Sequence, residues 1–226
     1  MSDQTPALEL RDLKFRYPGA APNAPWIVDV RSLQLQPGEQ ALLTGASGRG
    51  KSTLLQIVAG LIDPDQGVVR VHGQDIHAFS GAKRDLYRGS KVGMIFQNFN
   101  LLRGFSAKEN VLAALMFSEV PRKEHDARAL ELLKIVGIPT PDRDVADFSI
   151  GQMQRVAVAR AVATSPALVL ADEPTASLDP ENAGAAMDLI QSTCQKVGAA
   201  LLCTSHDPSM ADRFTRRESL DQLVTA

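Results

Sequence analysis

The sequence predicts an α/β protein with a mostly parallel sheet and a block of helices inserted in its middle. Residues 8–17 alternate between apolar and polar with one phase slip, which indicates a half-buried strand. Residues 168–171 form a continuous apolar run, as expected for a strand covered on both faces of a parallel sheet. Between these segments, residues 106–163 carry apolar residues at helical spacing.

The individual elements follow from apolar spacing and from the residues that open and close them. The turn Pro37-Gly38-Glu39 separates two strands, and His72-Gly73 follows one arm of a hairpin. Gly137 is suited to end a helix, and Pro180 and Pro208 are suited to begin one. We expect strands over 8–17, 27–35, 41–43, 68–71, 168–171 and 199–204. We expect helices over 54–61, 108–117, 122–136, 150–163 and 180–198, with a last short helix from 208.

The composition excludes several classes of protein. With 226 residues, of which 44% are hydrophobic and 22% charged, the chain is long enough to bury a sizeable core. The net charge of -2 provides no electrostatic basis for binding nucleic acid. No apolar run is long enough to cross a bilayer, and no signal peptide is recognisable. The two cysteines, Cys194 and Cys203, lack metal-ligand spacing and are typical of ordinary thiols in a reduced compartment, so we expect a cytoplasmic protein.

The strongest motif is a glycine-rich loop between a strand and a helix, which matches G-x-x-x-x-G-K-[ST]. It consists of Gly45, Ala46, Ser47, Gly48, Arg49, Gly50, Lys51 and Ser52. Glycines let successive backbone N–H groups turn inward around a phosphate, and the following helix favours anions at its N-terminus. Lys51 brings positive charge to the terminal phosphates, and Ser52 offers a ligand to Mg²⁺. The alternative, a glycine-rich turn with a surface lysine, carries very little weight.

Two adjacent acids follow the buried strand 168–171. Asp172 and Glu173 therefore lie at the carboxyl end of the sheet, where α/β proteins bind their ligands. Asp172 can hold Mg²⁺, and Glu173 can orient and polarise an attacking water. His206 follows another buried strand, where an imidazole can contact the γ-phosphate. An acidic pair alone is often a solvated turn and a lone histidine is often structural, but the phosphate loop upstream favours the functional interpretation.

A serine and a glutamine open the helix expected over 150–163. Ser149 and Gln152 match the S-x-x-Q capping box, which any helix start can use. A helix N-terminus with a free serine hydroxyl can equally bind a phosphate. Both interpretations stay open because they do not exclude each other.

In order and spacing, these motifs resemble the nucleotide-binding domain of ABC transporters over nearly the whole chain. The residues that carry the resemblance are 45–53, Gln97, 149–152, Asp172-Glu173, 176–179 and His206. The resemblance implies a P-loop NTPase with a RecA-like core, an N-terminal antiparallel β subdomain and an inserted α-helical subdomain. It further implies one ABC ATPase domain over 1–226, made of a catalytic core with the β subdomain (1–97 and 164–226) and a helical subdomain with the signature motif (98–163).

The resemblance also assigns roles to single residues. Tyr17 resembles the aromatic that stacks on adenine, and the alternative is a strand aromatic packed in the core. Asp179 resembles the acid that connects the two sites of a dimer, and it can also cap the helix before Pro180. The implied catalytic residues are Glu173, His206 and Gln97. The implied Mg²⁺ ligands are Ser52, Gln97 and Asp172. The implied ATP contacts are Tyr17, Gly45 to Thr53, Ser149, Gly151, Gln152 and Asp179.

Three features depart from the family pattern. Ile150 stands where the family usually has the first glycine of its signature, and Phe148 stands where it usually has leucine. A β-branched residue adopts a positive φ only at a cost and adds bulk beside the phosphate, so we expect Ile150 to slow hydrolysis more than it weakens nucleotide binding. Arg49 occupies a slot often filled by a small residue, and we expect it to point to solvent. No glycine follows Gly198, so the family's late hairpin is not expected.

The resemblance implies the partners and the location as well. It implies ATP and Mg²⁺ at the interface of a head-to-tail homodimer or heterodimer, separate membrane permease subunits, and attachment through them to the inner face of the cell membrane. Residues 96–102 and 109–111 resemble the ATPases of macrolide-efflux and lipoprotein-release systems, although polar amino-acid importers carry a similar stretch. A slowly hydrolysing, ATP-gated clamp is a further alternative. A DNA-repair ATPase is set aside because the insert shows no sustained heptads.

Four apolar residues shortly after Gln97 form a candidate partner site. They are Phe99, Leu101, Leu102 and Phe105. An exposed apolar cluster usually marks a binding surface, here one for the permease. The alternative, that these residues pack inside the helical insert, is equally compatible with the pattern.

Overall fold

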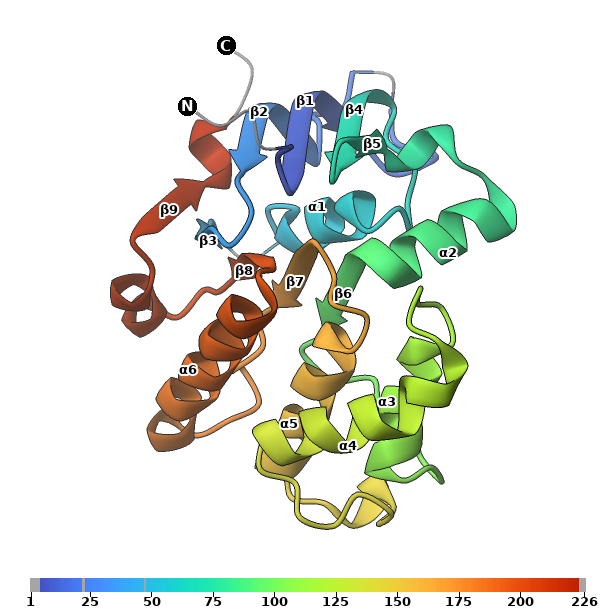
Figure 1. The fold of residues 1–226 in the computed structure, drawn as a ribbon. Helices are drawn as coiled ribbons and strands as arrows, with labels where there is room; N and C mark the ends of the chain where they lie inside the picture. Colours follow the sequence, from blue (N-terminus) through green and yellow to red (C-terminus); the bar gives the residue numbers. More distant parts are fainter. Residues whose placement is uncertain (1–4, 22, 47, 224–226) are drawn as a thin grey trace.

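The computed structural model describes residues 5–21, 23–46 and 48–223, which fold into two sheets and a group of helices (Figure 1). The antiparallel sheet has the strand order β2-β1-β4-β5. Its strands are β1 (Leu8–Phe15), β2 (Val28–Leu35), β4 (Gln66–Val71) and β5 (Gln74–Asp75). The other sheet is parallel, with the order β6-β7-β8-β3-β9. Its strands are β3 (Gln40–Thr44), β6 (Val92–Ile95), β7 (Leu168–Asp172), β8 (Ala200–Thr204) and β9 (Arg216–Ser219).

The described residues contain six α-helices. They are α1 (Lys51–Val58), α2 (Gly81–Lys91), α3 (Ala107–Leu115), α4 (His125–Ile135), α5 (Ile150–Val162) and α6 (Pro180–Val197). Of these, α1, α2, α5 and α6 contact the parallel sheet, whereas α3 and α4 pack against α5 and each other. Figure 1 shows α1 between the two sheets and α3, α4 and α5 together beyond the parallel sheet. No helix of the described part of the chain is both long and apolar enough to span a bilayer.

Two hydrophobic cores meet at the parallel sheet, because successive side chains of a strand point to opposite faces. On β7, Leu168 and Leu170 face the core that α1 shares with the antiparallel sheet. Val169 and Ala171 face the core of α3 to α6. Both faces are therefore covered, which explains the continuous apolar run of this strand and confirms the predicted fold class.

The phase slip in the first strand has a structural cause. Asp12 has φ 47°, and the pairing of β1 with β4 shifts register between Arg11 and Lys14. Such a bulge turns the following side chains back toward the core, so that both Leu10 and Leu13 are buried. Gly67 is required opposite the bulge, because a Cβ atom there would lie 2.5 Å from the carbonyl oxygen of Asp12.

Four of the helices and strands, α2, β5, β6 and β9, have no counterpart among the expected ranges. α2 contains no buried residue, so it carries no apolar period. β6 has only four residues, and β9, with the sequence RRES, is a polar edge strand. The expected last helix is a 3-10 segment, Pro208–Arg213, and the helix expected over 122–136 begins with another, Arg122–Glu124. The boundaries of the helical subdomain, 98–163, stay a prediction.

The two cysteines pack in the core as free thiols. Cys194 lies on α6 and Cys203 on β8. Burial raises the pKa of Cys194 to about 12, and it raises the pKa of Cys203 further. Both thiols therefore stay protonated and unreactive at neutral pH.

Candidate functional site

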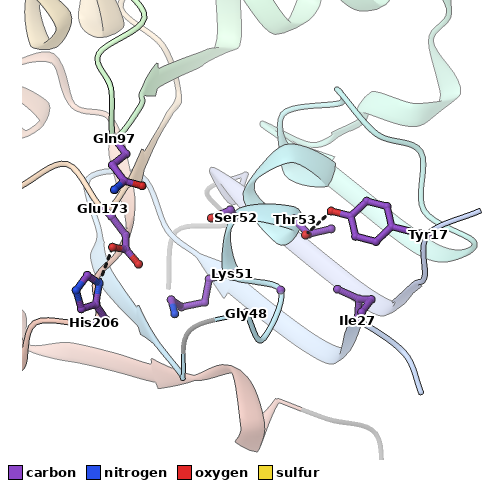
Figure 2. A pocket seen from close by; sticks show the side chains of 10 residues that line it. Tyr17, Ile27, Gly48, Lys51, Ser52, Thr53, Gln97, Glu173 and His206 are labelled. Atoms are coloured by element: carbon purple, nitrogen blue, oxygen red, sulfur yellow. Dashed lines mark hydrogen bonds and ion pairs between the residues drawn. The ribbon is translucent and has the colours of Figure 1, made fainter. Parts of the chain in front are cut away.

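A cavity of about 640 Å³ lies where α1 begins, beside the carboxyl ends of the parallel strands. Figure 2 shows Gln97, Glu173 and His206 on one side of it, Tyr17 and Ile27 on the other, and Lys51 between them. The full lining comprises Tyr17, Ile27, Gly48, Gly50, Lys51, Ser52, Thr53, Gln97, Glu173 and His206.

The loop between β3 and α1 leaves the start of the helix open to a ligand. Gly50, the residue before α1, has φ 92° and provides no side-chain cap for the first N–H groups. Only glycine fits there, because a Cβ atom would lie 2.3 Å from the carbonyl oxygen of Ile27. Uncapped N–H groups at a helix N-terminus attract anions. Of the predicted loop residues, Ser47 lies outside the described residues.

Lys51 is folded back over this loop. Its ammonium donates hydrogen bonds to the carbonyl oxygens of Gly45 at 2.7 Å and Ala46 at 3.1 Å, and the residue is only 5% exposed. An ammonium has three N–H donors, so one remains available to a ligand in the cavity. Arg49 behaves differently: its side chain is exposed and lies 3.9 Å from Asp221 in an ion pair, outside the cavity lining.

Tyr17 lies beyond the end of β1 at the rim of the cavity. Its hydroxyl is 3.0 Å from the Oγ1 of Thr53, and its ring meets the ring of Phe15 edge-on. The residue is 49% exposed, so the alternative that it packs in the core is wrong. A half-exposed ring fixed at both ends can stack on a flat ligand.

The acidic pair is held by Thr204, a buried residue at the end of β8. The Thr204 hydroxyl donates to Oδ1 of Asp172 at 2.7 Å and accepts from the backbone N–H of Glu173 at 3.0 Å. Glu173 has φ 44°, a left-handed conformation that is uncommon for residues other than glycine. Its carboxylate Oε2 lies 2.5 Å from Nδ1 of His206.

Gln97 follows β6 and faces the cavity on the side of Glu173 (Figure 2). Its backbone carbonyl oxygen accepts a hydrogen bond from the hydroxyl of Ser177 at 3.3 Å. Thr204, Ser177 and Ile27 were not among the predicted site residues. The sequence contains one signal for Thr204, a polar residue that ends a buried apolar strand shortly before His206.

Ser149 and Gln152 form the predicted capping box at the start of α5. The N–H of Gln152 donates to Oγ of Ser149 at 3.3 Å, and the N–H of Ser149 donates to Oε1 of Gln152 at 3.0 Å. Gly151 has open space where a Cβ atom would lie. None of these three residues lines the cavity at Lys51. Asp179 also lies outside that lining.

Asp179 caps α6, as the alternative for this residue predicted. Its Oδ1 accepts from the backbone N–H of Asn182 at 3.1 Å. The side-chain amide of Asn182 donates to the other carboxylate oxygen and lowers the pKa of Asp179. A capping role does not exclude a second contact outside this chain.

Ile150 is the first residue of α5 and has no positive φ. The part of our expectation that rested on a strained backbone is therefore wrong, because the helical φ of this position suits any residue. The side chain is 49% exposed and lines a second cavity of about 740 Å³ together with Phe99, Val145 and Met153. Any effect of Ile150 on a phosphate at this helix start therefore comes from the size of its side chain and not from its backbone.

Phe99 is 5% exposed, so the prediction that it belongs to an exposed apolar cluster is wrong. Leu101 is only partly buried, and it packs against the core of α3 to α6. Leu102 and Phe105 are about half exposed, at 45% and 47%. The exposed part of the predicted surface is thus limited to these two residues.

Comparison with known proteins identifies the family. Residues 28–176 match the family model described as ABC transporter. The chain belongs to the ABC transporter family. It is 35% identical to the lipoprotein-releasing system ATP-binding protein LolD of Chromohalobacter salexigens, over 98% of this chain and 96% of that protein. It is 37% identical to LolD of Nitrobacter winogradskyi, over 96% and 94% of the two chains.

Solved structures of ABC cassettes share the fold. A dimeric ATP-binding cassette in a post-hydrolysis state with ADP and Pi has a TM-score of 0.79 and 30% identity, over 94% of this chain and 93% of that one. The cbiO1 subunit of an ABC transporter complex from Clostridium perfringens has a TM-score of 0.77 and 26% identity, over 90% and 80%. The chain is therefore an ATP-binding subunit and ATPase of the ABC transporter family, with the P-loop NTPase fold.

Proposed function

We propose that this ABC ATPase hydrolyses MgATP as one half of a head-to-tail dimer and drives a separate membrane permease. The supporting observation is the division of the predicted site within one chain. Lys51, Glu173 and His206 line one cavity, whereas Ser149 and Gln152 begin a helix outside it. A second subunit placed head to tail would supply its own Ser149–Gln152 segment to this cavity.

The residues of the cavity suit ATP. The ring of Tyr17 stacks on the adenine, and the loop before α1 surrounds the phosphates with N–H groups. Lys51 exchanges its two carbonyl partners for phosphate oxygens, which is favourable because charge-assisted hydrogen bonds are the stronger ones.

The oxygen donors at the phosphate end fit Mg²⁺. This ion is usually held by one or two carboxylates together with substrate phosphates rather than by a cage of protein ligands alone. Ser52, Gln97 and Asp172 would hold the ion. When bound, it neutralises charge on the β- and γ-phosphates.

Hydrolysis requires a positioned water and a base. Glu173 accepts the proton of the water whose oxygen attacks the γ-phosphorus, while the bond from phosphorus to the ADP oxygen breaks. Thr204 fixes the backbone of Glu173, and His206 orients its carboxylate. The pair keeps the base aimed at the phosphate end of the cavity.

We further propose that the permease belongs to a lipoprotein-release or related efflux system, and that it holds this subunit at the inner face of the membrane. The support is the near-complete coverage of LolD proteins, which are named for lipoprotein release. The slowly hydrolysing clamp stays a second candidate, since the exposed bulk of Ile150 stands in the signature segment.

Two measurements test this function. First, affinity purification of the tagged chain from solubilised membranes should recover a permease with transmembrane helices, and ATP turnover should rise when that permease is present. Second, membrane vesicles that contain the complex should release lipoprotein to an acceptor only with hydrolysable ATP. Release with a non-hydrolysable analogue would favour the clamp, and recovery of a small-molecule permease would exclude the lipoprotein assignment.

A further inference from the structure

The guanidinium of Arg160 holds the loop that carries Gln97. Arg160 lies near the end of α5, the helix that begins after Ser149. Its Nη1 donates to the carbonyl oxygen of Asn100 at 2.5 Å, and its Nη2 donates to the carbonyl oxygen of Phe99 at 2.6 Å. The planar fork of an arginine donates to two neighbouring carbonyls through two separate nitrogens in a fixed geometry.

The backbone of this loop has an unfavourable conformation that the contacts of Arg160 help to hold. Phe99 has φ 60° and Asn100 has φ 47°, so two consecutive residues other than glycine adopt the left-handed conformation. Asparagine tolerates this conformation, but a bulky aromatic residue does so rarely. Strained backbone persists only where its surroundings hold it, and such sites cluster at functional loops. Here the surroundings are the Arg160 fork and the buried pocket of the Phe99 ring.

Within residues 5–21, 23–46 and 48–223, the hydrogen bonds of Arg160 go to these two carbonyls, and it forms no ion pair. Burial lowers the pKa of Arg160, although an arginine stays charged in proteins. Arg160 is partly buried, and the two loop carbonyls replace part of the hydration that its cation loses.

The same helix also contacts the segment that carries Glu173. The buried side chain of Gln154 donates from Nε2 to the carbonyl oxygen of Pro174 at 3.0 Å. Pro174 directly follows Glu173. Through Gln154 and Arg160, α5 therefore contacts the main chain beside both Glu173 and Gln97.

We propose that Arg160 is a positioning residue for ATP hydrolysis. It keeps residues 98–100 in the strained conformation, and this conformation holds Gln97 at the phosphate end of the cavity, on the same side as Glu173. Because α5 begins at the Ser149–Gln152 segment, the contacts of Arg160 couple the position of Gln97 to the helix that a second subunit's ATP would contact. The inference rests on the proposed role of Gln97 in the site.

Arg155 provides a matched control on the same helix. It also donates to a backbone carbonyl, that of Val136, at 2.8 Å, but this contact lies in the helical block away from Gln97. Arg160→Met and Arg155→Met each remove one guanidinium and keep a similar apolar stem. Both lose a helix-to-loop contact, so a purely structural effect should be similar in the two variants.

The first experiment needs neither nucleotide nor turnover. Hydrogen–deuterium exchange of the full-length chain should show faster exchange of the amides of 98–102 in Arg160→Met, and unchanged exchange there in Arg155→Met. Unchanged protection of 98–102 in Arg160→Met would overturn the proposal that Arg160 holds this loop, whatever the protein's activity is. This experiment therefore tests the role of Arg160 independently of the proposed ATPase function.

The second experiment is a double-mutant cycle in ATP turnover. Arg160→Met should lower kcat about tenfold or more with KM for ATP changed less than about twofold, since the loop positions the reacting groups rather than the adenine. Arg160→Lys should recover part of the loss. If Arg160 acts through Gln97, adding Arg160→Met to Gln97→Ala should cost nothing further.

Two outcomes of the turnover measurements would overturn the proposal. A full additional loss in the double variant would place the effect of Arg160 elsewhere than at Gln97. An equal loss of kcat in Arg155→Met would show that any weakening of α5 slows turnover. Loss of turnover in Lys51→Ala, measured alongside, shows whether the cavity is the ATPase site at all.

Discussion

The Nδ1 atom of His206 lies 2.5 Å from Oε2 of Glu173, so the imidazole and the carboxylate form a pair across the carboxyl ends of β8 and β7. Nδ1 donates to the carboxylate, and Nε2 of His206 has no protein partner among the described residues; a ring that carries a proton on both nitrogens can donate from Nε2 to a phosphate. This pair gives the carboxylate of Glu173 a defined orientation.

Glu173→Gln should keep ATP binding and accumulate a dimer. The amide keeps the size and one acceptor of the carboxylate but removes the charge that polarises water. The ATP-bound dimer therefore forms but does not hydrolyse its ATP. Size-exclusion chromatography with ATP and Mg²⁺ should show the dimer, and the same variant without nucleotide should elute as a monomer. A monomer at high protein concentration with ATP would argue against the head-to-tail arrangement.

Lys51→Ala should abolish hydrolysis and weaken ATP binding. The ammonium supplies both charge and position to the terminal phosphates, and alanine supplies neither. Phosphate release and binding of a fluorescent ATP analogue measure the two effects. Lys108→Ala, which removes a lysine paired with Asp142 outside the cavity, is the control and should retain turnover. Undiminished phosphate release from Lys51→Ala would contradict the assignment of the cavity.

Thr204→Val should lower turnover, because the valine cannot bond to Asp172 or to the N–H of Glu173. Losing a buried hydrogen-bond partner of this kind costs about 1–3 kcal/mol. If the loss falls on the transition state, ~1.4 kcal/mol corresponds to about tenfold in rate. Steady-state phosphate release measures it, and Thr204→Ser should retain most of the rate.

Thr193→Val is the matched control for this substitution. Thr193 is 1% exposed on α6, and its hydroxyl has no hydrogen-bond partner in the described structure. Replacing this hydroxyl by a methyl group should leave turnover unchanged and should not lower the melting temperature. Equal effects of the two valine variants would show that Thr204 matters only for packing.

Ile150→Gly should raise the turnover of the purified subunit and leave the ATP affinity of the single chain almost unchanged. The branched side chain is exposed at the start of α5, where a phosphate of the second subunit would approach. Ile150→Ala separates bulk from backbone freedom, since alanine keeps the helix start rigid. Because the φ of Ile150 is helical, we expect alanine to give most of the gain. Lower turnover in both variants would show that the site is built around isoleucine.

Phe105→Asp should weaken binding of the permease without unfolding the subunit, because this ring is 47% exposed. Phe99→Asp should instead lower the stability of the subunit, by about 3 kcal/mol or more, because it removes a buried ring and buries a charge. Thermal unfolding and co-purification with the permease distinguish the two variants. Full permease binding by Phe105→Asp would remove this surface from the interface.

The sequence by itself determined the α/β class, the phosphate loop, the acidic pair and the capping box of α5. These features are local: apolar periodicity, turn residues and motif spacing lie within a few neighbouring residues. The phase slip around Asp12 was also visible in the alternation, and the structure explains it as a bulge.

Only the tertiary structure decided which side of the molecule each remaining residue faces. Phe99 has the same apolar character as Phe105, yet it is buried, in a loop where two consecutive residues have a positive φ. The contacts of Thr204 with Asp172 and of Arg160 with Phe99 join segments far apart in the chain. Long-range hydrogen bonds depend on where carbonyl and hydroxyl groups point after folding, and no local pattern of residue types carries that information.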